Sequence, residues 1–177
     1  MKNTRNMESE QANTDIIELI LDDHVALKKL IKIMKDDDAE IGEKYAAFGE
    51  FAPLLTIHAK PEEQTLYVDM KEEEEQKLDG LEGDVEHALA DQLVNELKME
   101  TDDDLFEAKV KVLAELVEHH IEEEEEEMLP EYRKNTDIEK RRELGLQFLE
   151  IKEQIGMEHP MFNTAAAKEI QATSPLH

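Results

Sequence analysis

The chain has 177 residues, 40% of them apolar, which is enough for one domain with a sizeable core, and its formal net charge is −26. So acidic a chain repels nucleic acid and anionic membranes, and it has no apolar run long enough to span a bilayer, so we expect neither as a partner. The absence of cysteine excludes thiolate zinc sites, iron–sulfur clusters and cysteine nucleophiles, which leaves nitrogen and oxygen atoms as the ligands of any metal.

The predicted elements are long helices, because glycine and proline are scarce, at six and five residues. They cover residues 14–35, 41–77, 84–99, 105–129 and 138–157. This pattern predicts an all-α, up-down four-helix bundle with a short additional C-terminal helix. In chain order, we expect a mobile N-terminal tail (1–13), one domain (14–157) and a C-terminal tail (158–177).

Capping and turn residues define the expected helix ends. A good N-cap lies within residues 13–15, before the first helix. Gly80 and Gly83 are expected to form the turn before the third helix, and Pro130 is expected to end the fourth. Pro61 removes one backbone hydrogen bond from the second helix and is expected to kink it.

A histidine interrupts the apolar stripe of each long helix, where spacings of three and four residues mark the buried face. These histidines are His24, His58, His87 and His120. In the second and fourth helices a glutamate follows one turn later, on the same face. A buried carboxylate without a partner is very costly, so such groups are paired or bind metal. The predicted metal ligands are His24, His58, Glu62, His87, His120 and Glu124.

His119 competes with His120 for the place in the fourth helix. Its own stripe includes Glu123, and the acidic run 122–127 taken by itself would be a solvated face. The segments that begin at His58 and His120 share one pattern: a histidine, three residues, two acidic residues, two further residues and two apolar residues. This internal echo favours His120.

Together these motifs resemble the hemerythrin-like cation-binding domains, over residues 14–157. The motifs are Asp23-His24, the segment His58–Glu63, Glu86-His87, and the segment from His119 to Glu124 that leads to Leu129-Pro130. The resemblance implies a helical bundle that holds two non-haem, carboxylate-bridged iron ions with open coordination for dioxygen, peroxide or nitric oxide.

The resemblance also implies a role for each ligand. His24 and His58 would bind one iron, His87 and His120 the other, and Glu62 and Glu124 would bridge the two. One position departs from the oxygen-carrying hemerythrins, which have a histidine one turn after the third-helix ligand, where this chain has Asp91. We expect Asp91 or water to fill that place, and reversible oxygen carriage to be weakened.

Three functions fit the sequence. The first is a di-iron protein that binds or senses dioxygen, peroxide, nitric oxide or the cellular iron supply. The second is a di-iron enzyme that reduces peroxide or nitric oxide, or that supports the repair of damaged iron centres. The third is a metal-free helical interaction protein. The polar N-terminus lacks the apolar segment of a secretory signal, so a cytoplasmic location is expected.

Overall fold

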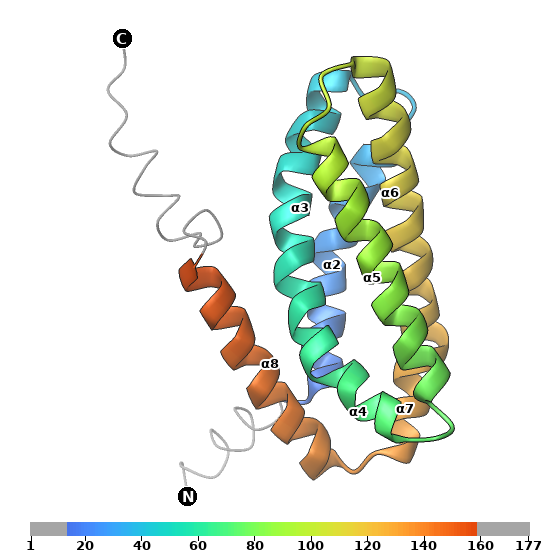
Figure 1. The fold of residues 1–177 in the computed structure, drawn as a ribbon, viewed down its shortest axis with the longest axis vertical. Coiled ribbons are helices and arrows are strands. Elements are labelled where there is room, and N and C mark those ends of the chain that lie inside the picture. Colours follow the sequence, from blue (N-terminus) through green and yellow to red (C-terminus); the bar gives the residue numbers. More distant parts are fainter. Residues whose placement is uncertain (1–13, 159–177) are drawn as a thin grey trace, which may run out of the picture.

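A computed structural model describes residues 14–158, which form helices and no strand (Figure 1). Four long helices lie side by side: α2 (Ile16–Lys35), α3 (Ile41–Gln64), α5 (Lys77–Leu97) and α6 (Asp103–Glu123). Both α2 and α5 contact α3 and α6, so the four helices form a closed ring. This arrangement confirms the predicted all-α bundle. The expected tails, 1–13 and all but the first residue of 158–177, lie outside the described residues.

The second helix is shorter than predicted, because it breaks at Thr65. The Thr65 hydroxyl donates a hydrogen bond to the carbonyl of Pro61 at 2.6 Å, which is the acceptor that the Thr65 N–H would use in a continuous helix. The Thr65 N–H turns to the carbonyl of Glu62 instead. A short helix, α4 (Leu66–Glu72), follows the break.

The turn predicted at Gly80 and Gly83 is also wrong, because both glycines lie inside α5. Their role is close packing against α4. A Cβ atom on Gly83 would lie 2.6 Å from Cζ of Tyr67, so a side chain there would displace the tyrosine ring. The chain turns earlier, at residues 73–76.

Pro130 does not end the fourth helix. After α6 the chain forms one π-helical turn, η1 (Glu124–Met128), in which the N–H of Leu129 donates to the carbonyl of Glu124, five residues back. A further helix, α7 (Leu129–Asn135), then begins. Pro130 lies in its first turn, where the missing N–H costs least.

The additional C-terminal helix, predicted over 138–157, is α8 (Ile138–Glu158), which has 21 residues, the same number as α5 and α6. It packs against α2 and α3 at one end of the bundle and diverges from them beyond (Figure 1). Leu144 and Phe148 are its buried apolar contacts. Arg141 donates from Nε to both oxygens of Asp15, which caps α2.

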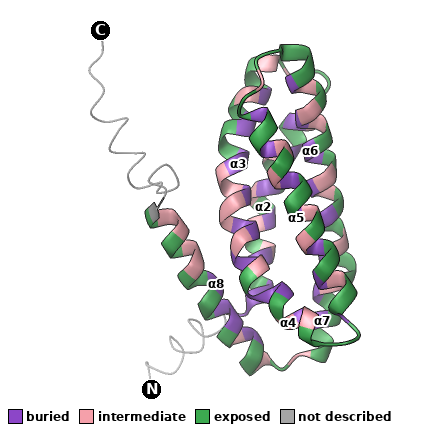
Figure 2. Ribbon diagram, in the orientation of Figure 1, coloured by how far each residue is buried: buried purple, intermediate pink, exposed green. Residues whose placement is uncertain are grey.

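Two apolar clusters fill the interior, one toward each end of the bundle. The larger cluster is built from α2, α3, α5 and α6, and includes Leu27, Phe51 and Val117. The smaller cluster includes Ile20 and Tyr67 and takes side chains from α8. Figure 2 shows buried residues along the inner faces of the long helices. Polar side chains occupy the interior between the two clusters.

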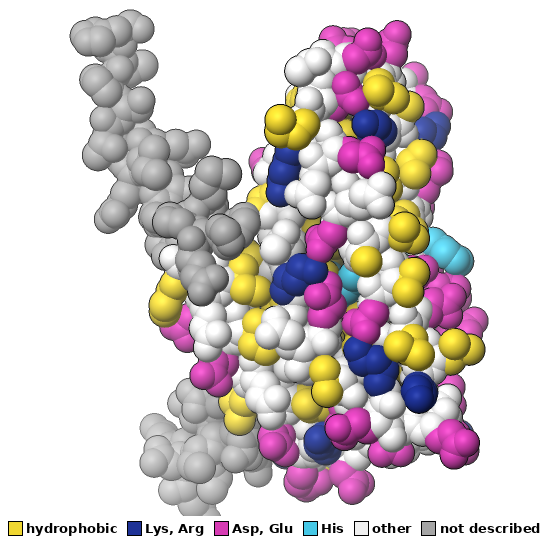
Figure 3. Space-filling model, viewed as in Figure 1, with side chains coloured by type: hydrophobic (Ala, Val, Ile, Leu, Met, Phe, Trp, Pro, Cys, Tyr) yellow, Lys and Arg dark blue, Asp and Glu magenta, His cyan; other side chains and the backbone are white. Residues whose placement is uncertain are grey.

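Acidic side chains are spread over the face shown in Figure 3 and are not gathered in one patch, as expected of a solvated surface. No helix within the described part of the chain, residues 14–158, is long and apolar enough to cross a membrane.

Candidate metal centre

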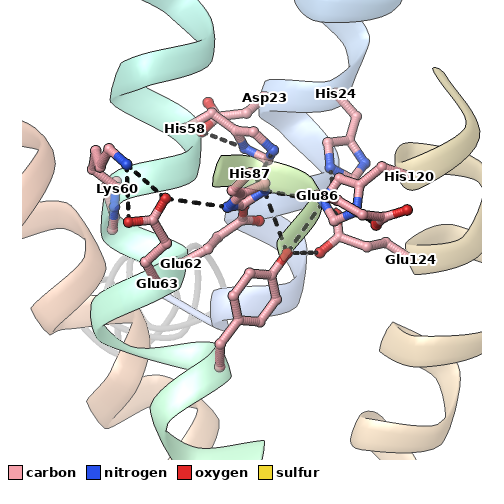
Figure 4. Close-up of polar contacts among 12 residues, drawn as sticks. Asp23, His24, His58, Lys60, Glu62, Glu63, Glu86, His87, His120 and Glu124 are labelled. Carbon is pink, nitrogen blue, oxygen red and sulfur yellow. Dashed lines mark hydrogen bonds and ion pairs between the residues drawn. The ribbon is translucent and has the colours of Figure 1, made fainter. Parts of the chain in front are cut away.

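All six predicted ligands meet in the polar layer between the two apolar clusters, and each is at most 3% exposed. Each bundle helix contributes a histidine, and Figure 4 shows the side chains converging on one another. His24 lies on α2, His58 and Glu62 on α3, His87 on α5, His120 on α6 and Glu124 at the start of η1. The ligand role of these residues stays a prediction, but the fold does bring all six together.

Each glutamate lies between two imidazoles from different helices. Oε2 of Glu62 lies 3.3 Å from Nε2 of His58 and 3.6 Å from Nε2 of His87. Oε2 of Glu124 lies 3.2 Å from Nε2 of His24 and 3.7 Å from Nε2 of His120. All four imidazoles therefore present the same nitrogen, Nε2, to the centre of the cluster.

Several polar atoms at the centre are buried without a hydrogen-bond partner. They include Nε2 of His24, Nε2 of His58, both carboxylate oxygens of Glu62 and Oε2 of Glu124. Buried polar atoms are normally hydrogen-bonded, because leaving them unpaired is costly. His24, His58, Glu62 and Glu124 each offer a ligand atom, and these atoms all lie within 4.8 Å of one another. The nitrogen and oxygen donors therefore fit a metal cation, which would give these atoms a partner.

The electrostatics of the cluster also fit a cation. Burial lowers the pKa of His58 to about 4, so its imidazole is neutral at pH 7 and can act as a ligand. Burial and the charge of Glu124 raise the pKa of Glu62 well above its ordinary value. Burial disfavours the ionised form of Glu124 as well, but the charges of His120 and His24 outweigh it and hold its pKa low. A bound cation would favour the ionised form of both carboxyls.

Four acidic residues face the outer nitrogens of the histidines. The distances to Nδ1 are 2.6 Å for Glu86 and His120, 3.0 Å for Glu125 and His24, 3.5 Å for Glu63 and His87, and 3.8 Å for Asp23 and His58. A carboxylate at the outer nitrogen holds the imidazole in the tautomer and orientation that bind metal. In every pair the acid comes from the neighbouring helix of the ring, so the four pairs form a closed cycle around the centre.

Sequence reasoning gave these four acids no role, although a signal was present. Each stands directly beside a predicted ligand in the chain: Asp23 before His24, Glu63 after Glu62, Glu86 before His87 and Glu125 after Glu124.

Tyr67 is a further buried polar residue that sequence reasoning missed. Its hydroxyl donates to Oε1 of Glu124 at 2.8 Å and lies 3.2 Å from Nε2 of His120 and 3.5 Å from Nε2 of His87. The space for its ring exists because residue 83 is glycine. The paired signals in the sequence were this glycine and a tyrosine five residues after Glu62.

The structure separates His119 from His120. The side chain of His119 is 64% exposed and lies 3.3 Å from Glu123, whereas His120 is buried at the centre. Asp91 does not reach the centre either: its carboxylate accepts a hydrogen bond from Lys60 at 2.6 Å. The place expected for Asp91 is thus left to another group, and Tyr67 is the buried side chain beside His87 and His120.

A narrow pocket of about 10 Å³ borders His87 and His120. Its other lining residues are Leu55, Glu86, Ala90, Leu116 and Val117. This volume is about that of one water molecule, and most of the wall is apolar. One side of the centre therefore adjoins a space that fits a very small molecule.

Comparison with known proteins identifies the domain. A family model, the hemerythrin HHE cation-binding domain, matches residues 15–132, about two thirds of the chain. The comparisons with curated proteins and with solved structures found no significant match. The matched range begins at the cap of α2, ends within α7 and contains all six predicted ligands. The chain therefore belongs to the hemerythrin HHE family of cation-binding domains, and its buried histidine–glutamate cluster is the candidate cation site.

Proposed function

We propose that this chain is a non-haem di-iron protein whose centre binds dioxygen, peroxide or nitric oxide, or responds to the iron supply of the cell. The observation that carries the proposal is the position of Glu62 and Glu124, each within 3.7 Å of two Nε2 atoms from different helices. His24 and His58 would hold one ion, His87 and His120 the other, and the two carboxylates would bridge them.

The donor set supports iron over other metals. Four imidazoles and two carboxylates suit iron, manganese or zinc, and carboxylate-bridged pairs in helical bundles are built from glutamate and histidine on facing helices. Structural zinc sites are almost always four-coordinate and closed, whereas this centre offers six donors to be shared by two ions. The pair would supply redox electrons and open coordination positions.

The second half of the centre, at His87 and His120, supports a small ligand. Asp91 is engaged by Lys60, so α5 offers that ion a single nitrogen donor and no neighbouring carboxylate from Asp91. The apolar pocket adjoins these two histidines. A space about the size of one water molecule favours a ligand as small as a diatomic molecule or a peroxide over a larger substrate.

The chain's own residues would have three tasks there. Two outer carboxylates, Glu86 on His120 and Glu125 on His24, are hydrogen-bonded to Nδ1 and hold these imidazoles with Nε2 toward the centre. The Tyr67 hydroxyl donates to Glu124 and holds that carboxylate in place. The apolar wall of Leu55, Leu116 and Val117 limits the entry of water.

Metal analysis of protein purified without added metal tests the proposal, combined with absorption spectra under anaerobic, aerobic, peroxide and nitric oxide conditions. We expect about two iron ions per chain, the count for a bridged pair. Glu124→Ala should lose iron, whereas Glu123→Ala, a half-exposed neighbour in the same acidic run, should retain it.

Stoichiometric zinc from cells with ample iron would overturn the assignment of iron. Absence of any metal would favour a metal-free interaction protein. Iron spectra that do not respond to any of the three ligands would leave iron binding in place and overturn the small-ligand role.

A further inference from the structure

Helix α8 reaches the candidate metal centre through a single side chain, Lys152. Its Nζ donates to both carboxylate oxygens of Asp23 at 2.7 Å. Asp23 in turn faces the outer nitrogen of His58, with Oδ2 at 3.8 Å from Nδ1. A chain of three side chains thus joins α8, α2 and α3 and ends at a predicted ligand.

The position of Lys152 is unusual among the lysines around the centre. Lys28 holds Glu125 at 2.6 Å and Lys60 holds Glu63 at 2.8 Å, and both lie on bundle helices. Lys152 lies on a helix that begins at Ile138, outside the family match that ends at residue 132. The third outer carboxylate, Asp23, is therefore held by an element that lies outside the range the family model matches.

The contact between His58 and its outer carboxylate is the loosest of the four. Oδ2 of Asp23 lies 3.8 Å from Nδ1 of His58, and this nitrogen, like Nδ1 of His87, has no hydrogen-bond partner. A small rotation of Asp23 decides whether that nitrogen is bonded. Lys152 donates to both oxygens of Asp23 and is only 24% exposed, so it restricts the orientation of the Asp23 carboxylate.

We propose that Lys152 is a positioning residue of the metal centre, through which α8 tightens metal binding at His58 by holding Asp23. The inference rests on the proposed metal site. The first half of α8 is anchored independently by Phe148 and by Arg141, which pairs with Asp15. Lys152 lies four residues after Phe148, and its Nζ lies 5.3 Å from the centre of the Phe148 ring. Replacing Lys152 removes that contact but leaves the buried Phe148 side chain and the Arg141–Asp15 pair in place.

Coupling of this kind is reciprocal: if docking of Lys152 strengthens metal binding, metal binding strengthens the docking by the same factor. Filling the centre should therefore order the end of α8. Because the chain has no cysteine, a single introduced cysteine can carry a probe of that order.

The test is a double-mutant cycle on the full chain, with the affinity for ferrous iron measured anaerobically against a coloured chelator. Asp23→Asn should weaken iron binding about 10- to 100-fold, as changes to residues that orient metal ligands do. Lys152→Met, one step further from the ligand, should weaken it roughly 3- to 10-fold. In the Asp23→Asn background, Lys152→Met should add nothing, because its effect runs through Asp23.

Two variants control for the general effect of removing a lysine. Lys152→Arg keeps a donor to the carboxylate and should restore most of the affinity. Lys140→Met removes another α8 lysine, which pairs with Asp69 at 2.9 Å, away from the centre, and should leave the affinity unchanged.

A second measurement uses an otherwise unmodified chain. A spin label on Gly156→Cys, in α8, should become less mobile when diamagnetic zinc is added, and a label on Gly42→Cys, in α3, should not. Both glycines have open space for a side chain. Three outcomes would each overturn this inference and leave the proposed function in place. They are equal iron affinity of Lys152→Met and Lys140→Met, additive effects in the cycle, and no change of the label at 156. A wild-type chain that binds no metal would overturn the proposed function, and the inference with it.

Discussion

The two halves of the candidate metal centre use the same donors but differ in their surroundings. Around His24 and His58 the donors are compact, with distances of 3.2 and 3.3 Å from Nε2 to the shared carboxylates. Around His87 and His120 those distances are 3.6 and 3.7 Å, and the two Nε2 atoms lie 3.0 Å apart. The second half also contains a tyrosine hydroxyl and adjoins the pocket.

The difference indicates a division of labour. A compact set of donors whose two outer carboxylates, Glu125 and Asp23, are both held by lysines is suited to holding an ion firmly, whereas in the other half only Glu63 has a lysine partner within residues 14–158. A looser set beside an apolar pocket is suited to an ion that keeps an open coordination position. We therefore expect the first half to hold its ion more tightly and the second half to meet the external ligand.

Removing the metal should have the largest effect. The polar layer interrupts the apolar interior, so the apo form carries unpaired buried groups that a cation would satisfy. A metal ion present at a free concentration a thousand times its Kd adds about 4 kcal/mol to the free energy of unfolding. For a domain of this size, that raises the Tm by roughly 10 °C. Melting curves followed by circular dichroism, with and without a chelator, check this, and superimposable curves would argue against an interior site.

The halves can be separated by His120→Ala. We expect this variant to retain about one iron per chain, in the half formed by His24 and His58, and to lose most of the near-ultraviolet charge-transfer absorption. His119→Ala is the matched control and should keep both ions, because His119 is exposed and lies beside Glu123. Loss of both ions from His120→Ala would mean that the two halves do not bind independently.

Helical periodicity alone was enough to predict the bundle and the six side chains at its centre. A stripe histidine with a glutamate one turn later is expected to face the interior. This rule fits His119 as well as His120, and the repeat shared with the second helix favoured His120, as the burial of the two residues confirms. The helix ends were harder to predict. Thr65 breaks its helix through its own hydroxyl, and Pro130 follows a π turn; both are local competitions between backbone and side chain that periodicity does not register.

The residues that sequence reasoning missed act across helices. Glu86 stands next to His87 in the chain but serves His120 on the neighbouring helix. Such a pairing depends on how two helices pack and on their offset along the bundle axis, and the sequence pattern of one helix contains neither quantity. The sequence left open whether Asp91 or water fills the place after His87 for the same reason, since the partner of Asp91, Lys60, lies on another helix.

The two carboxyls at the centre, Glu62 and Glu124, should respond oppositely to pH when metal is absent. The pKa of Glu62 is higher in the folded than in the unfolded protein, so ionising Glu62 destabilises the fold. The free energy of unfolding therefore falls as pH rises from the pKa of the unfolded state through that of the folded state. The lowered pKa of Glu124 means that its charge contributes stability, which is lost as pH falls below its unfolded value. At pH 7, apo Glu62→Gln should be at least as stable as wild type, and apo Glu124→Gln less stable by about 1–3 kcal/mol. Urea unfolding measures both, and equal effects would contradict the assignment.

The smallest expected effect tests the tyrosine of the open half. Tyr67→Phe removes one hydrogen bond to Glu124 and should cost the apo protein about 1 kcal/mol, with both iron ions retained. Tyr132→Phe is a matched control, because Tyr132 is equally buried and donates to Asp69 at 2.6 Å, away from the centre. Both variants should lose similar stability, but only Tyr67→Phe should change the iron absorption spectrum and the rate of nitric oxide binding, since only Tyr67 lies within 3.5 Å of His87 and His120. If the two variants give the same spectrum and the same rate, the tyrosine is a packing residue and the open half owes its character to the pocket alone.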